Sequence, residues 1–448
     1  MIFDTLSKFN NRIALIENEV VFTYEQLIEL SETLTKEIPS RSLVFLCCDN
    51  TIHTIAYYVG LLRKKSVPLL LPATMQETFL KKLISTYRPS YIIKCEKNTD
   101  KIKCPTTVSS KLHNDLALLL TTSGSTGSSK LVRLSYNNIV ANTKSIIQYL
   151  GISKQDRCIT TLPMSYTYGL SILQTHLVSG ASIIMYNNSV LSEKFCELIK
   201  RHQVTTFGGV PYTYEMLMKN SFFKHKHSSL RYITQAGGRL PSNLVTAVSS
   251  YCKKNDYELI VMYGQAEATA RMTYLPRQYT DAKPGSIGIP IPMGKISLQD
   301  EFGNIINENQ VTGEIIYSGP NVMLGYANDI YDLEKGDELG GVLYTGDLAH
   351  KDKDGFYYID GRKSRFIKMQ GIRINLDDIE KFIRNYNIAC LCGGQDDLLR
   401  IHVFQFIDQD FIKSIVSNNF NINKNFIQVL YDKEIPRNES GKIIYKDL

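Results

Sequence analysis

The chain has 448 residues, of which 43% are hydrophobic and 21% are charged, with 28 Gly and 14 Pro. This balance is typical of a folded globular protein of two or three domains, and it excludes collagen-like, mucin-like and largely disordered chains. The formal net charge is +7, but no dense block of Lys or Arg occurs. The charge pattern therefore argues against a nucleic-acid binder and suits an enzyme with anionic substrates.

The start of the chain, its apolar runs and its cysteines predict a cytoplasmic protein without a membrane span. Residues 1–9 lack the basic start, apolar stretch and small-residue cleavage site of a secretory signal. The longest apolar runs, at 68–72 and 116–120, are far shorter than the roughly 18 residues that a bilayer span needs. The nine cysteines include no CxxC pair, so we expect reduced thiols in the core.

The first part of the chain alternates short apolar runs with amphipathic stretches. Residues 116–121 predict a strand, and Ser135 and Gly151 predict the start and the end of a helix over 136–150. The same alternation continues to residue 263, with strands and helices expected in turn at 158–162, 170–178, 181–186, 192–202, 204–209, 214–219, 230–235, 243–254 and 258–263. Strands joined by helical crossovers predict mostly parallel sheets, with ligands at the carboxyl ends of the strands.

The remaining sequence divides into two parts of different character. From about residue 286, strands and turns alternate, with strands expected within 295–306, 313–319, 341–349 and 356–362. After a linker at 361–364, strands at 366–369 and 398–406 mix with helices near 376–385 and 410–418. We predict an α/β protein with an N-terminal core at 1–285, a β-rich subdomain of that core at 286–361, and a small mobile α+β C-terminal domain at 362–448.

A loop rich in hydroxyl groups follows the strand at 116–121. The segment TTSGSTGSSK (121–130) holds seven Ser or Thr, two Gly and one Lys. Backbone N–H groups, hydroxyls and a cation together suit a polyphosphate. The segment is not a Walker A loop, because GxxxxGK[ST] does not occur. A flexible surface linker would need no flanking core strands, so the pattern favours a phosphate-binding loop.

Further motifs stand in one order along nearly the whole chain. They are VFTYEQLIELSETL (21–34), GLLRKKSVPLLLP (60–72), LPMSYTYGL (162–170), TQAGGRLP (234–241), MYGQAEAT (262–269), TGEIIYSGPNVMLGY (312–326), YTGDL (344–348), GRKSRFIKMQGIRIN (361–375) and PRNESGKI (436–443). Together with the loop at 121–130, they resemble the adenylate-forming superfamily of acyl-CoA synthetases, carrier-protein adenylation domains and firefly luciferase.

The resemblance implies a two-step ligase that uses ATP and Mg²⁺. A small carboxylic acid is joined to the α-phosphate of ATP with release of pyrophosphate, and the acyl group then passes to the thiol of CoA or of the phosphopantetheine arm of an acyl carrier protein. Both reactants of the first step are anions, so the site needs cations between them. The resemblance assigns the nucleotide's phosphates to Thr122, Ser123, Gly124, Ser125, Thr126, Gly127 and Lys130.

Three residues match the superfamily's catalytic positions. Lys442 corresponds to the lysine that bridges the acid and the α-phosphate, and Glu267 corresponds to the Mg²⁺-binding glutamate. Lys368 lies on the face that serves thiol transfer, after a rotation of the small domain about a hinge that corresponds to Ser364. The superfamily usually has Asp or Lys at this hinge, and it usually has Thr where this chain has Ala266.

Five residues match positions that surround the nucleoside. Tyr263 corresponds to the aromatic side chain that stacks on adenine, and Gly264 stands beside it. Asp347 corresponds to the carboxylate that accepts the ribose hydroxyls, and Arg362 to the guanidinium on the ribose and phosphate side. Gly237 belongs to the segment that lines adenine and the acyl pocket, where a missing side chain lets the ligand approach the backbone.

The acyl substrate is predicted to contact Tyr166, Thr167, Phe207, Gly208 and Gln235. Members that activate α-amino acids have an Asp at the position of Thr167, and a neutral threonine cannot compensate a buried ammonium group. We therefore expect an acid without a free α-amine. Gly208 and its neighbour Gly209 leave room for a flat or branched acid.

Two alternatives stay open at this stage. The chain could be a free-standing amino-acid adenylation enzyme that loads a carrier protein, with another counter-charge in place of Thr167. It could also be a catalytically impaired nucleotide-binding protein, a reading that only Ala266 and Ser364 support. The identity of the acid, the choice of CoA or carrier protein, and the oligomeric state are not determined by the sequence.

Overall fold

The structure is a computed structural model that describes residues 2–95, 100–103, 111–121, 130–369, 372–437 and 443–445. The chain forms two compact units. The first contains Met1–Ile296 and Tyr317–Leu343, and the second contains Ser297–Ile316 and Tyr344–Leu448. The boundaries between the units fall within three strands, so each unit is built from segments distant in sequence. The predicted three-part division remains a prediction.

A nine-stranded sheet organises the site-bearing part of the first unit. Its order is β15-β14-β13-β12-β11-β9-β10-β1-β2, and the six strands from β13 to β1 run parallel. The strands are β1 (Ile13–Glu17), β2 (Val20–Thr23), β9 (Arg157–Ile159), β10 (Ser182–Met185), β11 (Thr206–Gly209), β12 (Tyr232–Gln235), β13 (Glu258–Tyr263), β14 (Thr273–Tyr274) and β15 (Ile289–Pro290).

A second sheet of seven strands belongs to the same unit, in the order β19-β8-β7-β4-β3-β5-β6. Its strands are β3 (Leu43–Cys48), β4 (Val67–Pro72), β5 (Tyr91–Lys94), β6 (Asp100–Lys103), β7 (Leu116–Thr121), β8 (Leu131–Ser135) and β19 (Gly325–Ala327). Both faces of its centre are covered. Along β3, Val44 and Leu46 face one hydrophobic cluster while Phe45 and Cys47 face another, which is why the strand reads as a continuous apolar run.

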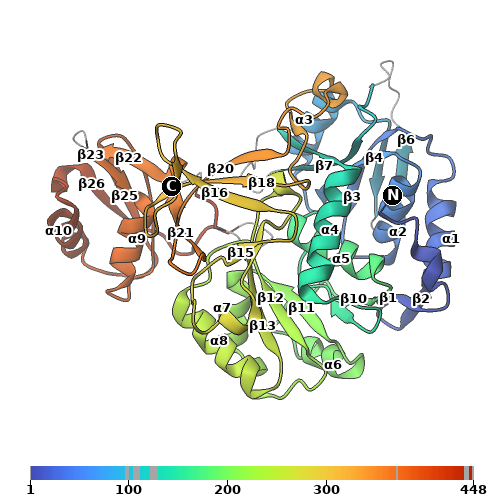
Figure 1. Cartoon of the computed structure of the whole chain (residues 1–448), viewed down its shortest axis with the longest axis horizontal. Coiled ribbons are helices and arrows are strands. Elements are labelled where there is room, and N and C mark those ends of the chain that lie inside the picture. Colours follow the sequence, from blue (N-terminus) through green and yellow to red (C-terminus); the bar gives the residue numbers. More distant parts are fainter. Residues whose placement is uncertain are drawn as a thin grey trace. The chain divides into compact units, whose positions relative to one another are not determined.

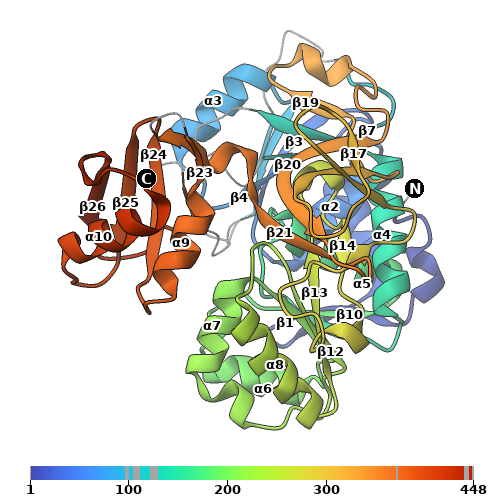
Figure 2. The same ribbon diagram turned by 60° about the vertical axis from the view of Figure 1, so that its left-hand side comes forward.

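Helices α1 to α8 cover these sheets (Figure 1). Helices α2, α4 and α5 lie between the two sheets: α2 contacts strands of both sheets, α4 contacts the seven-stranded sheet, and α5 contacts the nine-stranded sheet and α4. Helices α7 and α8 contact the nine-stranded sheet from its other side (Figure 2). Their bounds are α1 (Tyr24–Thr35), α2 (Ile52–Arg63), α3 (Glu77–Tyr87), α4 (Tyr136–Leu150), α5 (Thr167–Val178), α6 (Glu193–Arg201), α7 (Pro211–Lys219) and α8 (Ser242–Lys254). Short 3₁₀ turns occur at Leu6–Phe9, Ser221–Lys224, Ala266–Ala268, Arg277–Tyr279 and Tyr331–Glu334.

The ends of α4 show how local sequence sets an element of the site. Ser135 accepts a hydrogen bond from the N–H of Asn138, and the Asn138 side chain accepts one from the N–H of Ser135. At the other end Gly151 has φ +65°, a left-handed conformation that glycine adopts without a steric penalty. The predicted cap, helix and stop are confirmed.

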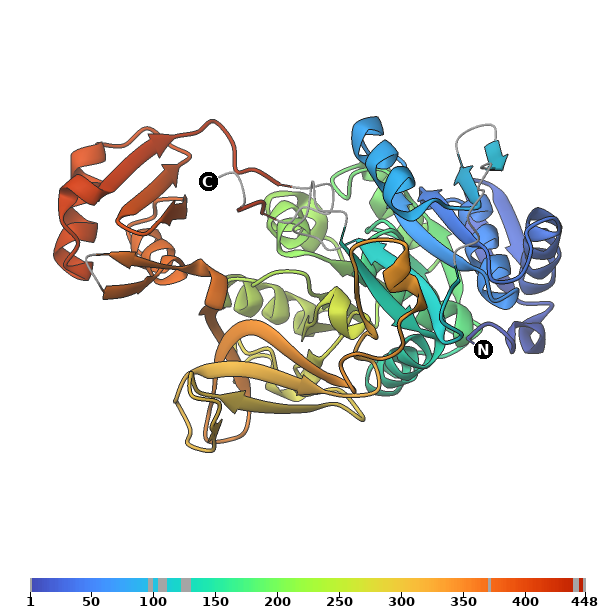
Figure 3. The same ribbon diagram turned by 90° about the horizontal axis from the view of Figure 1, so that it is seen from above.

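The second unit contains three smaller sheets. A five-stranded sheet has the order β17-β16-β18-β20-β21, a hairpin joins β22 and β23, and a three-stranded sheet has the order β24-β25-β26. Figure 3 shows α9 and α10 beside the last of these sheets, in orange-red and red. The bounds are β16 (Lys295–Gln299), β17 (Ile305–Ile306), β18 (Gly313–Ser318), β20 (Val342–Lys351), β21 (Tyr357–Arg362), β22 (Phe366–Met369), β23 (Ile372–Asn375), α9 (Leu376–Arg384), β24 (Cys390–Gln395), β25 (Leu398–Val403), α10 (Gln409–Phe420) and β26 (Ile427–Tyr431), with 3₁₀ turns at Lys363–Arg365 and Lys424–Phe426.

The predicted α/β class is confirmed, and the two large sheets of the first unit are mixed sheets with parallel strands at their centres. All eight described cysteines are free thiols, and seven of them are buried. Within the described ranges, no helix has the length and apolar character needed to cross a bilayer. The predicted linker at 361–364 comprises the end of β21 and part of a 3₁₀ turn inside the second unit.

Candidate functional site

Most of the predicted site residues of the first unit follow four neighbouring parallel strands. The order β13-β12-β11-β9 places the segments after these strands at one edge of the nine-stranded sheet. Tyr166 and Thr167 follow β9 at the start of α5, and Gly208 is the residue before the last one of β11. Gly237 follows β12, and Glu267 follows β13. Ligands of such sheets bind outside the carboxyl ends of the strands, so the topology supports a single site at this edge.

A carboxylate, an aromatic ring and a cation meet beside the end of β13. The Oη of Tyr326 donates a hydrogen bond to Oε1 of Glu267 at 2.9 Å. The Nζ of Lys130 lies 3.4 Å from the centre of the Tyr326 ring, which is a cation–π contact. Burial and the Glu267 charge raise the pKa of the Tyr326 hydroxyl, so Tyr326 remains a donor. The sequence prediction included Glu267 and Lys130 but missed Tyr326, although its motif ends at this residue.

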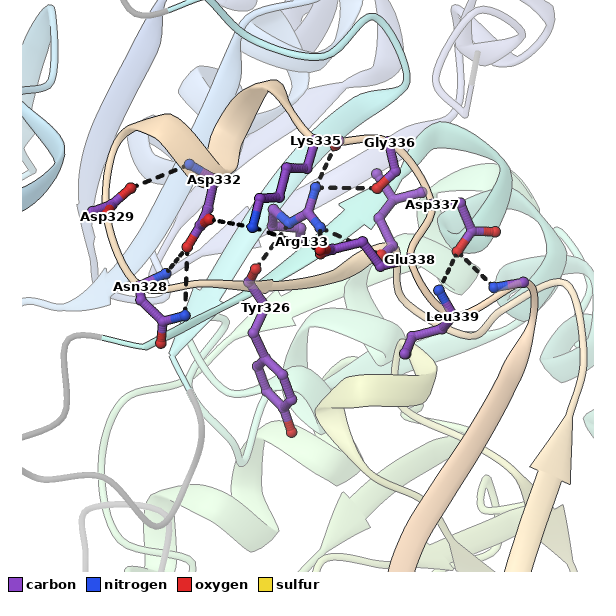
Figure 4. A network of polar contacts seen from close by, with 12 residues as sticks. Arg133, Tyr326, Asn328, Asp329, Asp332, Lys335, Gly336, Asp337, Glu338 and Leu339 are labelled. Carbon is purple, nitrogen blue, oxygen red and sulfur yellow. Dashed lines mark hydrogen bonds and ion pairs between the residues drawn. The ribbon is translucent and has the colours of Figure 1, made fainter.

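A buried arginine fixes the strand that carries Tyr326 (Figure 4). Arg133 is fully buried, and its guanidinium pairs with Glu338. It also donates to the backbone oxygens of Tyr326 at 3.2 Å, Gly336 at 3.3 Å and Leu324 at 3.4 Å, and to that of Lys335. Burial lowers the pKa of Arg133, but the carboxylate of Glu338 opposes this shift. The network ties β8 to the segment 324–338 and thereby orients Tyr326 toward Glu267.

The segment between β13 and β14 is folded tightly. A Cβ at Gly264 would lie 1.8 Å from the backbone oxygen of Ala270, so only glycine fits there. Thr269 has φ +65°, an uncommon conformation for a β-branched residue, and its hydroxyl donates to the backbone oxygen of Asn321 at 2.6 Å. A strained conformation of this kind persists only where surrounding contacts hold it. Here the hydrogen bond from Thr269 to Asn321 holds the turn that follows Glu267.

The turn after β12 is shaped by Gln235 and Gly237. The amide of Gln235 is buried and donates to the backbone oxygen of Gly238 at 2.9 Å, so this side chain supports the turn from within. Gly237 has φ +83°, and a Cβ there would lie 2.4 Å from the Oη of Tyr166. The space beside Gly237 is therefore occupied by Tyr166, whereas the sequence prediction left it to a ligand.

Phe207 and Gly208 point to opposite faces of β11, as successive strand residues do. The ring of Phe207 packs edge-on against Phe195 and Phe222 at centroid distances of 5.6 and 5.7 Å. A Cβ at Gly208 would meet Ile172 at 2.6 Å and Tyr168 at 2.9 Å. Protein side chains therefore fill the room that the sequence prediction assigned to the acid at Gly208. Thr167 is buried at the first position of α5.

A small recess lies between β11, β12, α4 and α5, with room for about one water molecule. Gly208, Thr234 and Arg271 line it, together with His176 and Tyr232. The full lining is Ile146, Leu150, Ile152, Ile172, Thr175, His176, Thr206, Phe207, Gly208, Tyr232, Thr234 and Arg271, and it contains no acidic side chain. The sequence analysis did not select Arg271, although it lies only two residues after the motif at 262–269.

In the second unit, Asp347 and Arg362 face each other across the pair β20–β21. The Nε of Arg362 donates to Oδ1 of Asp347 at 2.6 Å, and the Asp347 side chain is only 3% exposed. Glu314 supports the same turn, because it accepts the N–H of Gly346 at 3.0 Å and pairs with Lys363 at 2.7 Å. The two predicted ribose-contacting residues are thus brought together. Lys368 is exposed on β22.

Seven predicted site residues lie outside the described residues. They are Thr122, Ser123, Gly124, Ser125, Thr126, Gly127 and Lys442.

Tyr263 ends β13, where its hydroxyl accepts a hydrogen bond from Gln265 at 3.4 Å. No cluster of three His, Cys, Asp or Glu side chains suited to a metal occurs among the described residues. Glu267 alone still fits Mg²⁺, which usually takes one or two carboxylates and completes its shell with phosphate and water.

Comparison with known proteins identifies the family. A family model described as AMP-binding enzyme matches residues 2–327. The 2-succinylbenzoate–CoA ligase of Bacillus subtilis is 29% identical over 286 residues, which cover 63% of this chain and 56% of that protein. The long-chain-fatty-acid–CoA ligase of the same organism is 30% identical over 281 residues, covering 60% and 48%. These alignments span only about half of the relatives' length.

Solved structures share the whole fold. The O-succinylbenzoate coenzyme A synthetase (MenE) of Bacillus subtilis, in complex with ATP and magnesium ion, superposes with a TM-score of 0.80 at 21% identity, covering 100% of this chain and 98% of that one. ATP-bound MatB from Rhodopseudomonas palustris gives 0.78 at 20% identity, covering 100% and 96%. At these identities the likeness shows the fold, whereas the match over 2–327 shows the family. The chain belongs to the AMP-binding enzyme family.

Proposed function

We propose that the chain is an ATP-dependent carboxylic acid ligase that forms an acyl-adenylate and then transfers the acyl group to a thiol. The observation that carries this proposal is the group formed by Lys130, Tyr326 and Glu267 at the carboxyl edge of the parallel strands. It offers a cation and a hard oxygen ligand, and Lys130 is the last residue of the Ser/Thr-rich segment 121–130 in the sequence. The relatives named above are CoA ligases, which agrees with this chemistry.

The first step joins two anions. An oxygen of the acid's carboxylate attacks the α-phosphorus of ATP, the bond to the β-phosphate breaks, and pyrophosphate leaves with that electron pair. Two like unit charges about 4 Å apart repel by roughly 4 kcal/mol at an effective dielectric of 20, so cations must stand between them. Lys130 supplies one of these charges, and Lys442 is proposed to supply another by bridging the acid and the α-phosphate.

Mg²⁺ bound to Glu267 would neutralise phosphate charge when the nucleotide is present. Tyr326 keeps one oxygen of that carboxylate hydrogen-bonded and so fixes its direction. Tyr263 is proposed to stack on adenine, and Asp347 with Arg362 to contact the ribose. Lys368 is proposed to serve the second step, in which the thiolate sulfur attacks the acyl carbon and AMP leaves.

The acid is proposed to lack a free α-amine. Thr167 is neutral, and the lining of the recess behind Gly208 contains a cation and no acidic side chain. A buried ammonium group would find no counter-charge on that side and would lose its hydration. This argument favours a carboxylic acid ligase over the amino-acid adenylation alternative.

The test is ATP–pyrophosphate exchange with aryl, short-chain, long-chain and amino acids in the presence of Mg²⁺. We expect exchange with one class of carboxylic acid, none with amino acids, and a loss of at least about 100-fold in Lys442→Ala. A wild-type protein that exchanges with no acid would contradict the proposal. Near-normal exchange by Lys442→Ala would remove that lysine from the mechanism.

The acceptor thiol is CoA or the phosphopantetheine arm of a carrier protein. Offering each of them to the protein with ATP and the best acid, and weighing the products by mass spectrometry, distinguishes the two. Thioester formation on only one of them identifies the acceptor. AMP formation without any thioester would limit the activity to the first step.

A further inference from the structure

Arg271 is an arginine whose burial calls for an anion. Its side chain is 1% exposed, and it forms no ion pair with any described residue. One Nη donates to Ser171 Oγ at 3.0 Å and the other contacts the sulfur of Met262, while the guanidinium lies 4.1 Å from the centre of the Tyr168 ring. Its Nε is buried without a hydrogen-bond partner. These neutral contacts do not balance a full buried charge.

Other polar atoms of the recess also lack partners. The Nε2 of His176 and the hydroxyl of Tyr232 are buried and unpaired, and both residues line the same cavity as Arg271. Three unpaired polar groups around one cavity are unusual, because buried donors and acceptors are almost always satisfied. The Nε of Arg271 and the hydroxyl of Tyr232 are donors, so a ligand oxygen would satisfy both of them. The Nδ1 of His176 donates to the backbone oxygen of Ile172 at 2.8 Å, so its Nε2 is an acceptor and would need a donor such as a water molecule.

The fully buried Arg133 and the partly buried Arg365 show what a purely structural role looks like. Arg133 pairs with Glu338, and Arg365 pairs with Asp377 and Glu380. Both therefore have carboxylate partners within the protein. Arg271 has no carboxylate partner among the described residues, although it is as far removed from solvent as Arg133.

The position of the recess relates it to the acyl substrate. Gly208 and Thr234 line it and belong to β11 and β12, whose carboxyl ends form the candidate site. Toward that site lie Tyr168, which contacts Arg271, and Tyr166, whose ring centre is 6.4 Å from that of Tyr168 and whose hydroxyl fills the space beside Gly237. The recess therefore lies at the inner end of the acyl side.

We propose that the acid activated by this chain carries a second carboxylate, which binds in this recess to Arg271. The inference rests on the proposed ligase function and specifies its substrate class as a dicarboxylic acid. One carboxylate reacts with ATP while the other accepts hydrogen bonds from the guanidinium of Arg271 and from the hydroxyl of Tyr232. A carboxylate is larger than one water molecule, so binding requires Ile172 or Tyr166, both only partly buried, to change rotamer.

The experiment compares matched acids and matched variants. Aliphatic and aromatic diacids are each paired with the analogue whose distal carboxylate is replaced by a carboxamide, and kcat/KM is measured by pyrophosphate exchange for the wild type, Arg271→Met and Arg271→Lys. We expect the wild type to prefer a diacid over its amide by at least about 100-fold, on the scale of one lost charged hydrogen-bonding partner. Arg271→Met abolishes this preference, because kcat/KM for the diacid falls by at least about 100-fold and that for the amide falls much less, and Arg271→Lys restores part of it.

Direct binding keeps this test separate from the ligase proposal. Calorimetric titration of each protein with the same diacids, without ATP, is expected to show binding to the wild type and a loss of at least about tenfold in affinity for Arg271→Met. Binding through Arg271 without exchange would refute the ligase function and leave the recess as an anion site. A wild-type preference for the amide, an equal loss for both acids in Arg271→Met, or no diacid binding at all would overturn the inference.

Discussion

Arg133 and Arg271 are two fully buried arginines of the same unit with opposite surroundings. Arg133 has a carboxylate partner and four backbone carbonyl groups around it (Figure 4). Arg271 has a hydroxyl, a sulfur and an aromatic ring. A buried charge is stable when its partners are complete, so the first arginine stabilises the fold. The second is left with unsatisfied hydrogen-bonding capacity beside the acyl side of the site.

The comparison also separates support from chemistry. Arg133 acts on the site through Tyr326, whose strand it holds and whose hydroxyl orients Glu267. Arg271 lines a cavity, and its proposed role is to bind the second carboxylate of the acid there. Substitutions at the two arginines should therefore affect different measurements.

The largest change in stability is expected from Arg133→Met. It removes the charge partner of Glu338 and leaves buried carbonyl groups without donors, so the free energy of unfolding should fall by about 3–5 kcal/mol in urea titrations. The control is Arg201→Met, which removes an exposed pair with Glu19 and should leave the unfolding midpoint unchanged. An equal response of the two variants would remove the structural role assigned to Arg133.

Glu267→Gln should affect activity and not stability. The amide oxygen can still accept the hydrogen bond from Tyr326, but it cannot supply the charge that Mg²⁺ requires. Pyrophosphate exchange should fall by at least about 100-fold, with the remaining activity needing more Mg²⁺, and the unfolding midpoint should not move. Glu301→Gln, at an exposed position of the second unit, serves as the control. Unchanged Mg²⁺ dependence would exclude Glu267 as the ligand.

Arg271→Met tests the other half of the comparison. Because a side chain of similar length replaces a charge without an ionic partner, the free energy of unfolding should change by less than about 1.5 kcal/mol in either direction. Urea titration measures this directly. A loss of about 3 kcal/mol or more would place Arg271 in the same structural class as Arg133.

The smallest effect is expected from His176 in the same recess. Burial lowers the pKa of its imidazole below the usual 6.5, so the folded protein keeps it neutral while the unfolded chain takes up a proton. Stability should therefore fall as the pH drops below about 6.5. In His176→Gln this loss between pH 7.5 and 5.5 should shrink by up to about 1.4 kcal/mol, measured by urea titration at both pH values. An identical pH dependence in the two proteins would show that folding does not lower the pKa of His176.

Much of the fold follows from local sequence signals. The alternation of apolar runs and amphipathic stretches predicts the strands and helices of the first unit, and Ser135 and Gly151 mark a helix whose caps are formed as expected. The motif order along the chain is sufficient to indicate the family. What spacing cannot show is which strands become neighbours, and therefore that the nine-stranded and seven-stranded sheets are separate.

The candidate site is less predictable than the fold. Sequence singles out Glu267, Asp347 and Arg362 as candidates because each stands in a motif at or near the end of a strand, and the structure pairs Asp347 with Arg362. It cannot reveal that Arg271 is buried without a carboxylate partner. It also cannot show that Tyr166 fills the space beside Gly237, because both facts depend on the packing of segments distant in sequence.

The most direct test of acyl-adenylate formation follows the oxygen atoms of the acid. The acid, labelled with ¹⁸O in its carboxylates, is incubated with the protein, ATP, Mg²⁺ and the thiol acceptor, and the nucleotide products are analysed by mass spectrometry. Attack of the carboxylate on the α-phosphorus predicts AMP that carries one ¹⁸O atom. Formation of ADP with label in inorganic phosphate, or of AMP without label, would contradict the account.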